Sequence, residues 1–124
     1  CLAFDPARPT RVMAIDLRTM RLVVDGELPP GVFIHYGNAF EEDGRIVFEV
    51  TRYPDFAVDG ALRDIFNAEV PDAGDLYRCS IDLGSGQVAE SAVPGLLQGE
   101  FPVWDPRRTG LRHRYLWLAT MADN

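Results

Sequence analysis

Hydrophobic and polar positions alternate along most of the chain in short runs, which is the pattern of half-buried β-strands. In the clearest run, Arg45–Tyr53, apolar residues fall on both faces at one end. This predicts a strand that is covered on both sides. The runs that predict strands are Arg11–Ile15, Arg21–Val24, Val32–Tyr36, Arg45–Tyr53, Leu76–Leu83, Gln87–Val93 and Tyr115–Thr120.

Turn residues separate these runs at a spacing of about 10 positions. Glu42-Asp43-Gly44, between two apolar runs, predicts a hairpin because glycine supplies the positive φ that a tight turn requires. Short antiparallel strands at this spacing favour a sandwich, a barrel or a propeller. No internal repeat is visible, but propeller blades need not resemble one another in sequence. We therefore expect an all-β fold of antiparallel sheets.

One segment has a helical pattern. Asp59 is a suitable N-cap, and Leu62, Ile65 and Phe66 share one face at helical spacing. We expect a helix of about two and a half turns that runs to Glu69 and is ended by Pro71. A short helix in a loop between strands is the plain interpretation.

Composition and charge narrow the possible functions. The chain has 124 residues, of which 47% are hydrophobic and 25% charged, as in an ordinary globular domain. Its formal net charge of -7 argues against a nucleic-acid partner, which needs a basic surface. No apolar run approaches the ~18 residues that a membrane-spanning helix needs. Because the chain begins without Met and stops just after an apolar strand, we expect it to be a piece of a longer polypeptide.

The two cysteines, Cys1 and Cys79, lie far apart in the sequence. Neither belongs to a CxxC pair or a Cys/His spacing, so neither is a plausible zinc ligand or redox pair. We expect two free thiols in a reducing compartment, and hence a cytoplasmic protein.

His35 and His113 are the two histidines of the chain. His35 lies inside the apolar run Val32–Tyr36. A lone histidine in a strand is usually a core side chain that makes one hydrogen bond. The alternative is a metal ligand, which requires several convergent groups. Two histidines cannot form a site with three or four ligands unless carboxylates contribute.

Glu100 is the second candidate, because it stands between a glycine and an apolar residue after the uncharged run Val93–Leu97. Its ordinary interpretation is an exposed acid in a loop. The functional alternative is a buried carboxylate that orients a ligand.

The segment Asp105–Tyr115 (DPRRTGLRHRY) is densely basic. Phosphate or RNA binding is conceivable there. A structural loop is favoured, in which the arginines bond carboxylates and backbone carbonyls.

Common catalytic motifs are missing from the sequence. It contains no GxSxG, no Walker loop, no GxGxxG after a strand and no HExxH. A carboxylate pair for glycoside hydrolysis stays open because Asp and Glu are plentiful, but no spacing points to one.

Three segments together resemble the carotenoid cleavage oxygenase family. Phe33–Gly44 (FIHYGNAFEEDG) is similar to its His-x-x-Asn-Ala-aromatic-Glu-Glu segment. Leu76–Leu83 (LYRCSIDL) is similar to its Leu-x-Arg-Trp-x-Ile-Asp strand, with Cys79 in place of Trp. Gly99–Pro102 (GEFP) and Asp105–Tyr115 are similar to its Glu-Phe-Pro…Arg-x-x-Gly-x-x-His-Arg-Tyr segment. The order and approximate spacing agree over almost the whole chain.

The resemblance implies a seven-bladed β-propeller, of which residues 1–124 would be a partial domain of about two to three blades with one short helix. Family members hold a non-haem Fe(II) on the propeller axis with four histidines, and outer glutamates bond three of these. His35 matches the third ligand in chain order, and Glu100 matches the glutamate that pairs with it. His113 matches a residue that is not a ligand. The other ligands would lie outside this chain.

The implied reaction is oxidative cleavage of a conjugated double bond in a carotenoid or apocarotenoid by O2. Some relatives are isomerases or cleave stilbenoids instead. The resemblance also implies peripheral membrane contact through parts of the protein outside this chain. The isolated segment should be inactive, since one histidine cannot retain Fe(II). Two other hypotheses stay open: a metal-free propeller that acts as a binding or scaffold protein, and an unrelated β-sandwich in which His35 and Glu100 lie far apart.

Overall fold

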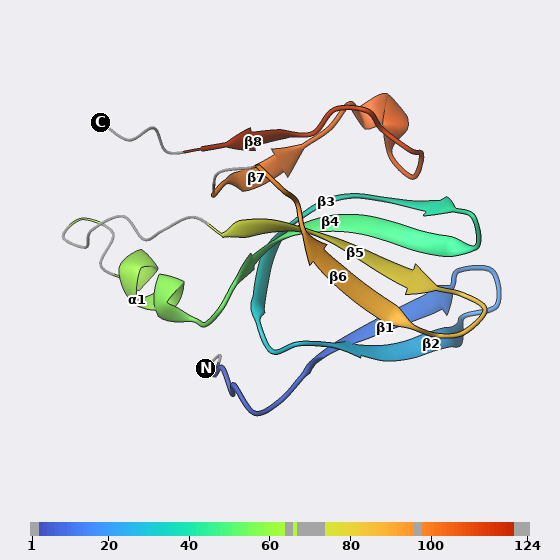
Figure 1. The fold of residues 1–124 in the computed structure, drawn as a ribbon, viewed down its shortest axis with the longest axis horizontal. Coiled ribbons are helices and arrows are strands. Elements are labelled where there is room, and N and C mark those ends of the chain that lie inside the picture. Colours follow the sequence, from blue (N-terminus) through green and yellow to red (C-terminus); the bar gives the residue numbers. More distant parts are fainter. Residues whose placement is uncertain (1–2, 64–65, 67–73, 96–97, 121–124) are drawn as a thin grey trace.

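The fold is built from three antiparallel sheets in a row. The computed structural model describes residues 3–63, 66, 74–95 and 98–120. A four-stranded sheet, in the order β3-β4-β5-β6, lies between a β1-β2 hairpin and a β7-β8 pair (Figure 1). Its elements are β1 (Thr10–Asp16), β2 (Arg21–Leu28), β3 (Val32–Glu42), β4 (Arg45–Tyr53), α1 (Ala57–Arg63), β5 (Asp75–Asp82), β6 (Val88–Ala92), β7 (Glu100–Val103), a 3-10 turn (Pro106–Arg108) and β8 (Trp117–Ala119).

Each of the seven predicted strands is present; β4 has the predicted bounds, and the ends of the others are shifted. The hairpin predicted at Glu42-Asp43-Gly44 is also confirmed: β3 ends at Glu42, β4 begins at Arg45, and Asp43 and Gly44 have φ of 50° and 74°. Positive φ at both central residues matches the right-handed twist of the flanking strands.

The structure differs from the predicted strands in two further ways. The strand predicted at Val32–Tyr36 continues to Glu42, because two register irregularities let β3 keep pairing with β4 through its polar second half. The strand β7 was not predicted, since four residues that contain a proline give too short a pattern.

The expected helix begins earlier than predicted. Asp59 lies inside α1, and the side chain of Asp55 accepts the Ala57 amide near its start instead. Phe66 stands in a turn with 95% of its surface exposed, so it does not extend an apolar helical face. Ile65, Glu69 and Pro71 lie outside the described residues.

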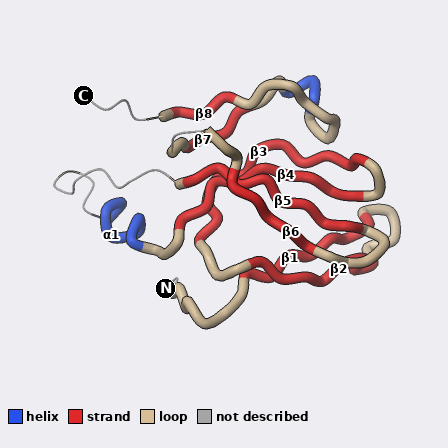
Figure 2. The backbone as a smooth tube through the Cα atoms, in the orientation of Figure 1, coloured by secondary structure: helices blue, strands red, loops and turns tan. Residues whose placement is uncertain are grey.

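The apolar core lies between the β1-β2 hairpin and one face of the four-stranded sheet. One cluster joins Ala14 and Val24 to Ile81, and the next joins Leu28 to Val50 and Cys79. Figure 2 shows the hairpin lying along that sheet.

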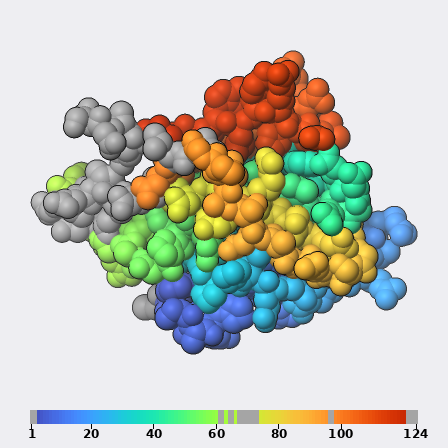
Figure 3. Space-filling model, viewed as in Figure 1, coloured from blue at the N-terminus to red at the C-terminus, as the bar shows by residue number. Residues whose placement is uncertain are grey.

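The other face of the same sheet is covered by β7, β8 and the loop between them, of which Figure 3 shows the red and red-orange part at the top of the view. Glu49, Val50 and Thr51 are all buried although successive side chains of a strand point to opposite faces. The prediction that this strand is covered on both sides is therefore confirmed.

Cys79 is a free thiol at the centre of the core, with 0% of its surface exposed, and Cys1 lies outside the described residues. Burial is the main cause that raises the pKa of the Cys79 thiol to about 12. The reactive thiolate is therefore scarce near neutral pH.

We expect Cys79 to resist alkylation at pH 8 in the folded protein and to react fully in urea. Mass spectrometry of the Cys79 peptide after iodoacetamide treatment measures this. Cys1→Ser serves as the background, so that Cys79 is the chain's remaining thiol. Rapid labelling without denaturant would contradict the burial of this side chain.

Candidate metal-ligand site

Glu100 and His35 form the predicted contact. His35 Nδ1 lies 2.6 Å from Glu100 Oε2, across 65 positions of sequence. The Glu100 side chain is 14% exposed, so its ordinary interpretation as an exposed loop acid is wrong. The β-sandwich hypothesis, which required these two residues to lie far apart, is wrong as well.

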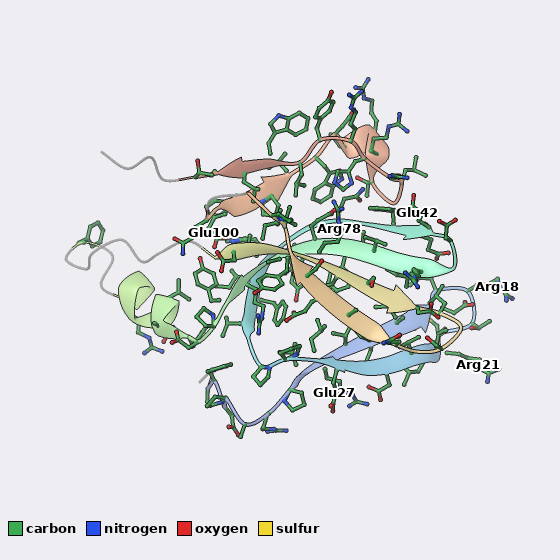
Figure 4. All side chains as sticks on the ribbon, viewed as in Figure 1. Arg18, Arg21, Glu27, Glu42, Arg78 and Glu100 are labelled. Carbon is green, nitrogen blue, oxygen red and sulfur yellow. The ribbon has the colours of Figure 1, made fainter. Side chains whose placement is uncertain are left out.

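Four donors surround the Glu100 carboxylate. Besides His35, the Thr51 hydroxyl donates to Oε2 over 3.2 Å, and the Gly74 amide donates to Oε1 over 3.0 Å. The Tyr53 hydroxyl donates to Oε1 as well. We name these five residues the Glu100 cluster. Figure 4 shows Glu100 at the part of the sheet where β7 approaches it.

The cluster favours an ionised carboxylate. Burial alone raises the pKa of Glu100, but the hydrogen bonds from Tyr53, His35, Gly74 and Thr51 together hold it below its ordinary value. Burial and the neighbouring carboxylate raise the pKa of Tyr53 to about 12, so its hydroxyl stays a donor. The negative charge on Glu100 is thereby retained next to the imidazole.

Thr51 is placed by an irregularity in strand pairing. Phe33 pairs with Arg52 and Tyr36 pairs with Val50, so two residues of β3 stand opposite Thr51 alone. The Thr51 hydroxyl lies 3.2 Å from the His35 amide nitrogen and 3.3 Å from the His35 carbonyl oxygen. One side chain therefore contacts both the backbone of His35 and the carboxylate that bonds its ring.

Phe101 contacts the His35 ring from β7. The two ring centroids are 4.4 Å apart at an interplanar angle of 46°. Neighbouring strand residues normally point to opposite faces, but Phe101 has φ of 54°, which breaks that alternation. Glu100 and Phe101 can therefore both reach the same imidazole. A positive φ at a bulky residue is strained, and such strain concentrates at functional sites.

The arrangement leaves one nitrogen of His35 for a further partner. A carboxylate at Nδ1 favours a proton on that nitrogen, which leaves the lone pair on Nε2. The ring is 35% exposed, so it is reachable. A metal-ligating histidine with a carboxylate behind it has the same arrangement. Among the described residues, however, no group of three or more His, Cys, Asp and Glu could hold a metal ion.

His113 lies in a different polar group. Its side chain is 6% exposed, its Nε2 is 3.7 Å from Glu49 Oε2, and its Nδ1 is 3.2 Å from the amide nitrogen of Asn38. Arg78 bonds the other oxygen of Glu49 over 3.1 Å. His113 therefore contributes to the packing of the loop between β7 and β8.

The basic segment Asp105–Tyr115 is a structural loop, as predicted. Arg107 and Asp105 form a two-point ion pair, and Arg112 bonds Glu42 over 2.7 Å. No finding tests phosphate or RNA binding there. In the part of the chain that the structure describes, no helix is long and apolar enough to cross a membrane.

The whole chain, residues 1–124, matches the model of the family described as retinal pigment epithelial membrane protein. The chain belongs to the carotenoid cleavage oxygenase family. Its all-β fold with one short helix is accordingly part of a β-propeller, as the resemblance implied.

The chain is similar to members of this family in both sequence and structure. The apocarotenoid-15,15'-oxygenase of Synechocystis sp. is 29% identical over 121 residues, which are 95% of this chain and 24% of that protein. The crystal structure of cobalt-substituted Synechocystis ACO matches with a TM-score of 0.76 and 27% identity, over 95% of this chain and 25% of that one. A chimera of ACO and RPE65 matches with a TM-score of 0.77 and 27% identity, over the same shares. The chain thus spans about a quarter of the length of the relatives it matches.

Several residues around His35 and Glu100 escaped prediction. Thr51 and Tyr53 stand two apart near the end of β4, and a shared strand face was their one available signal. Gly74 contributes a backbone amide, which no side-chain pattern reveals. Phe101 contacts His35 through an unusual backbone angle, which the sequence does not indicate.

We expect Tyr53→Phe to lower the free energy of unfolding by about 1.5 kcal/mol, because it removes a hydrogen bond to a charged group. In a Glu100→Gln background the same change should cost only about 0.5 kcal/mol, since the bond partner is then neutral. Urea denaturation followed by circular dichroism measures both values.

Tyr36→Phe is the matched control, because Tyr36 is 58% exposed and outside the Glu100 cluster. Its effect on stability should be small. Equal costs of Tyr53→Phe in the two backgrounds would show that Tyr53 and Glu100 are not coupled.

Proposed function

We propose that this chain is a partial propeller domain of a non-haem Fe(II) dioxygenase that cleaves a conjugated double bond of a carotenoid, an apocarotenoid or a related polyene. The hydrogen bond between His35 Nδ1 and Glu100 Oε2 carries the proposal. It joins the two residues that the family resemblance assigns to one ligand and its supporting carboxylate. The cobalt-substituted relative and the apocarotenoid oxygenase relative support the metal and the substrate class, respectively.

His35 would contribute one neutral imidazole to the metal through Nε2. Imidazole suits iron, and four such ligands leave positions open for other groups. When bound, Fe(II) supplies the redox chemistry that activates O2. In the overall reaction one C=C bond and one O2 become two carbonyl groups, so both oxygen atoms are retained in the products.

Glu100 would act on the metal through His35. By accepting a hydrogen bond from Nδ1–H it fixes the tautomer and the angle of the ring, and its charge raises the basicity of Nε2. Burial makes that charge more effective, because few water molecules screen it. Thr51, Tyr53 and Gly74 hold the carboxylate in the required orientation.

Residues 1–124 alone should neither retain iron nor cleave a polyene. The described part of the chain offers His35 without further convergent ligands. The remaining ligands would come from other parts of the full-length protein. The site is therefore tested in that protein.

We expect His35→Ala in the full-length protein to abolish iron retention and apocarotenal formation. Glu100→Gln should weaken iron binding roughly 10- to 100-fold while the ligand itself remains. Iron content after dialysis and product analysis by chromatography measure these effects.

Glu41→Gln is the matched control for the carboxylate, because Glu41 is exposed on the same strand as His35. It should leave iron content and turnover at the level of the parent protein. Full activity of His35→Ala would overturn the assignment of His35. Normal iron content together with no cleavage of any polyene would overturn the reaction instead.

A further inference from the structure

Asn38 connects the strand of His35 to the loop that follows the strand of Glu100. It lies on β3, three positions after His35, and 1% of its surface is exposed. Its Nδ2 donates to the carbonyls of Arg108 over 3.0 Å and Leu111 over 2.8 Å. Its Oδ1 accepts the amide of Gly110 over 3.1 Å. We name these three bonds the Asn38 clamp.

The clamp holds backbone rather than side chains. Arg108, Gly110 and Leu111 are exposed, so little side-chain burial fixes this part of the loop. Gly110 has φ of 77°, and its backbone forms a parallel bridge with Phe40 of β3. Both polar atoms of the buried Asn38 side chain are hydrogen-bonded to the loop. The clamp therefore fixes the distance between the loop and β3 closely, because any separation would leave these buried atoms without partners.

Strand β7 is short, and its own pairing is irregular. It has four residues, and its pairing with β8 is irregular, with register partners at Glu100 and Val103 alone. The Glu100 cluster attaches its first residue to β3 and β4. The loop that the Asn38 clamp holds begins at Asp105, two positions after the last residue of β7. Both attachments therefore reach back to β3.

We propose that Asn38 is a positioning residue for the metal site. By holding the 105–115 loop on β3, it keeps β7 at the distance at which the Glu100 carboxylate meets His35 Nδ1. This inference rests on the proposed function, because it assumes that His35 ligates a metal. Asn38 acts on His35 through Glu100 and does not touch the metal.

Asn38→Asp in the full-length protein tests the inference with almost unchanged volume. It keeps the acceptor for Gly110 but replaces the amide NH2 by an oxygen that faces the Arg108 and Leu111 carbonyl oxygens and His113 Nδ1. The readout is Co(II) binding to the metal-free protein, followed by the visible spectrum of the bound ion. We expect affinity to fall about tenfold, at the lower end of what loss of a supporting partner costs, with a changed spectrum.

A double variant separates positioning from general destabilisation. If Asn38 acts through Glu100, Asn38→Asp should add little to the affinity already lost in Glu100→Gln. Losses that multiply would overturn the inference. Wild-type Co(II) affinity and spectrum in folded Asn38→Asp would also overturn it.

Gly110→Ala is a second variant in case Asn38→Asp does not fold. It strains the loop at its positive φ, where a Cβ would meet open space, and leaves Asn38 intact. We expect a loss of Co(II) affinity of several-fold that again adds little to that of Glu100→Gln. Unchanged Co(II) affinity in Gly110→Ala would contradict the positioning role of the Asn38 clamp.

Arg112→Ala is the matched control, because Arg112 joins the same loop to the same strand through an exposed ion pair with Glu42. Figure 4 shows Glu42 near the hairpin tip, away from Glu100. The Co(II) affinity of Arg112→Ala should equal that of the parent protein. Unchanged Co(II) binding in His35→Ala would refute the proposed function, whereas loss in His35→Ala with none in Asn38→Asp refutes only this inference.

Discussion

A partly buried carboxylate with four donors is the constraint around which this part of the propeller is arranged. Glu100 would be costly to bury as an anion unless its oxygens were bonded. Its partners come from β3, from two positions of β4 and from the residue before β5. Satisfying one side chain therefore fixes β7 against the neighbouring sheet. The same bonds keep the carboxylate ionised and leave Nε2 of His35 available.

Irregular backbone serves this arrangement at two places. The register irregularity in β3 sets Thr51 opposite two residues, and its hydroxyl reaches the backbone of His35. The positive φ of Phe101 brings its ring and the Glu100 carboxylate to the same imidazole. Regular strands would send neighbouring side chains to opposite faces. The surrounding bonds compensate for the backbone strain, as is typical of functional sites.

The two faces of the four-stranded sheet bury different kinds of side chain. The face toward β1-β2 is apolar, with Val50 and Cys79 buried at its centre. The face toward β7-β8 carries buried polar side chains, among them Asn38, Glu49 and Thr51. Apolar packing stabilises the sheets without a strict direction, whereas hydrogen-bonded groups specify one relative position. The polar face is therefore the one suited to hold side chains in a fixed relative geometry.

The sequence by itself determined the all-β class, every strand that the structure describes except β7, and the hairpin at Asp43-Gly44, because alternation and turn chemistry are local properties. Its motifs also indicated His35 and Glu100 as a pair. Only the tertiary structure decided that Glu100 is partly buried, that β7 is a strand, and that Thr51, Tyr53 and Gly74 complete the cluster. These facts depend on which segments pack together across as many as 65 positions. The alternation that predicts a strand is visible among neighbouring residues. The partners of a side chain are not, because they come from segments that are distant in the sequence.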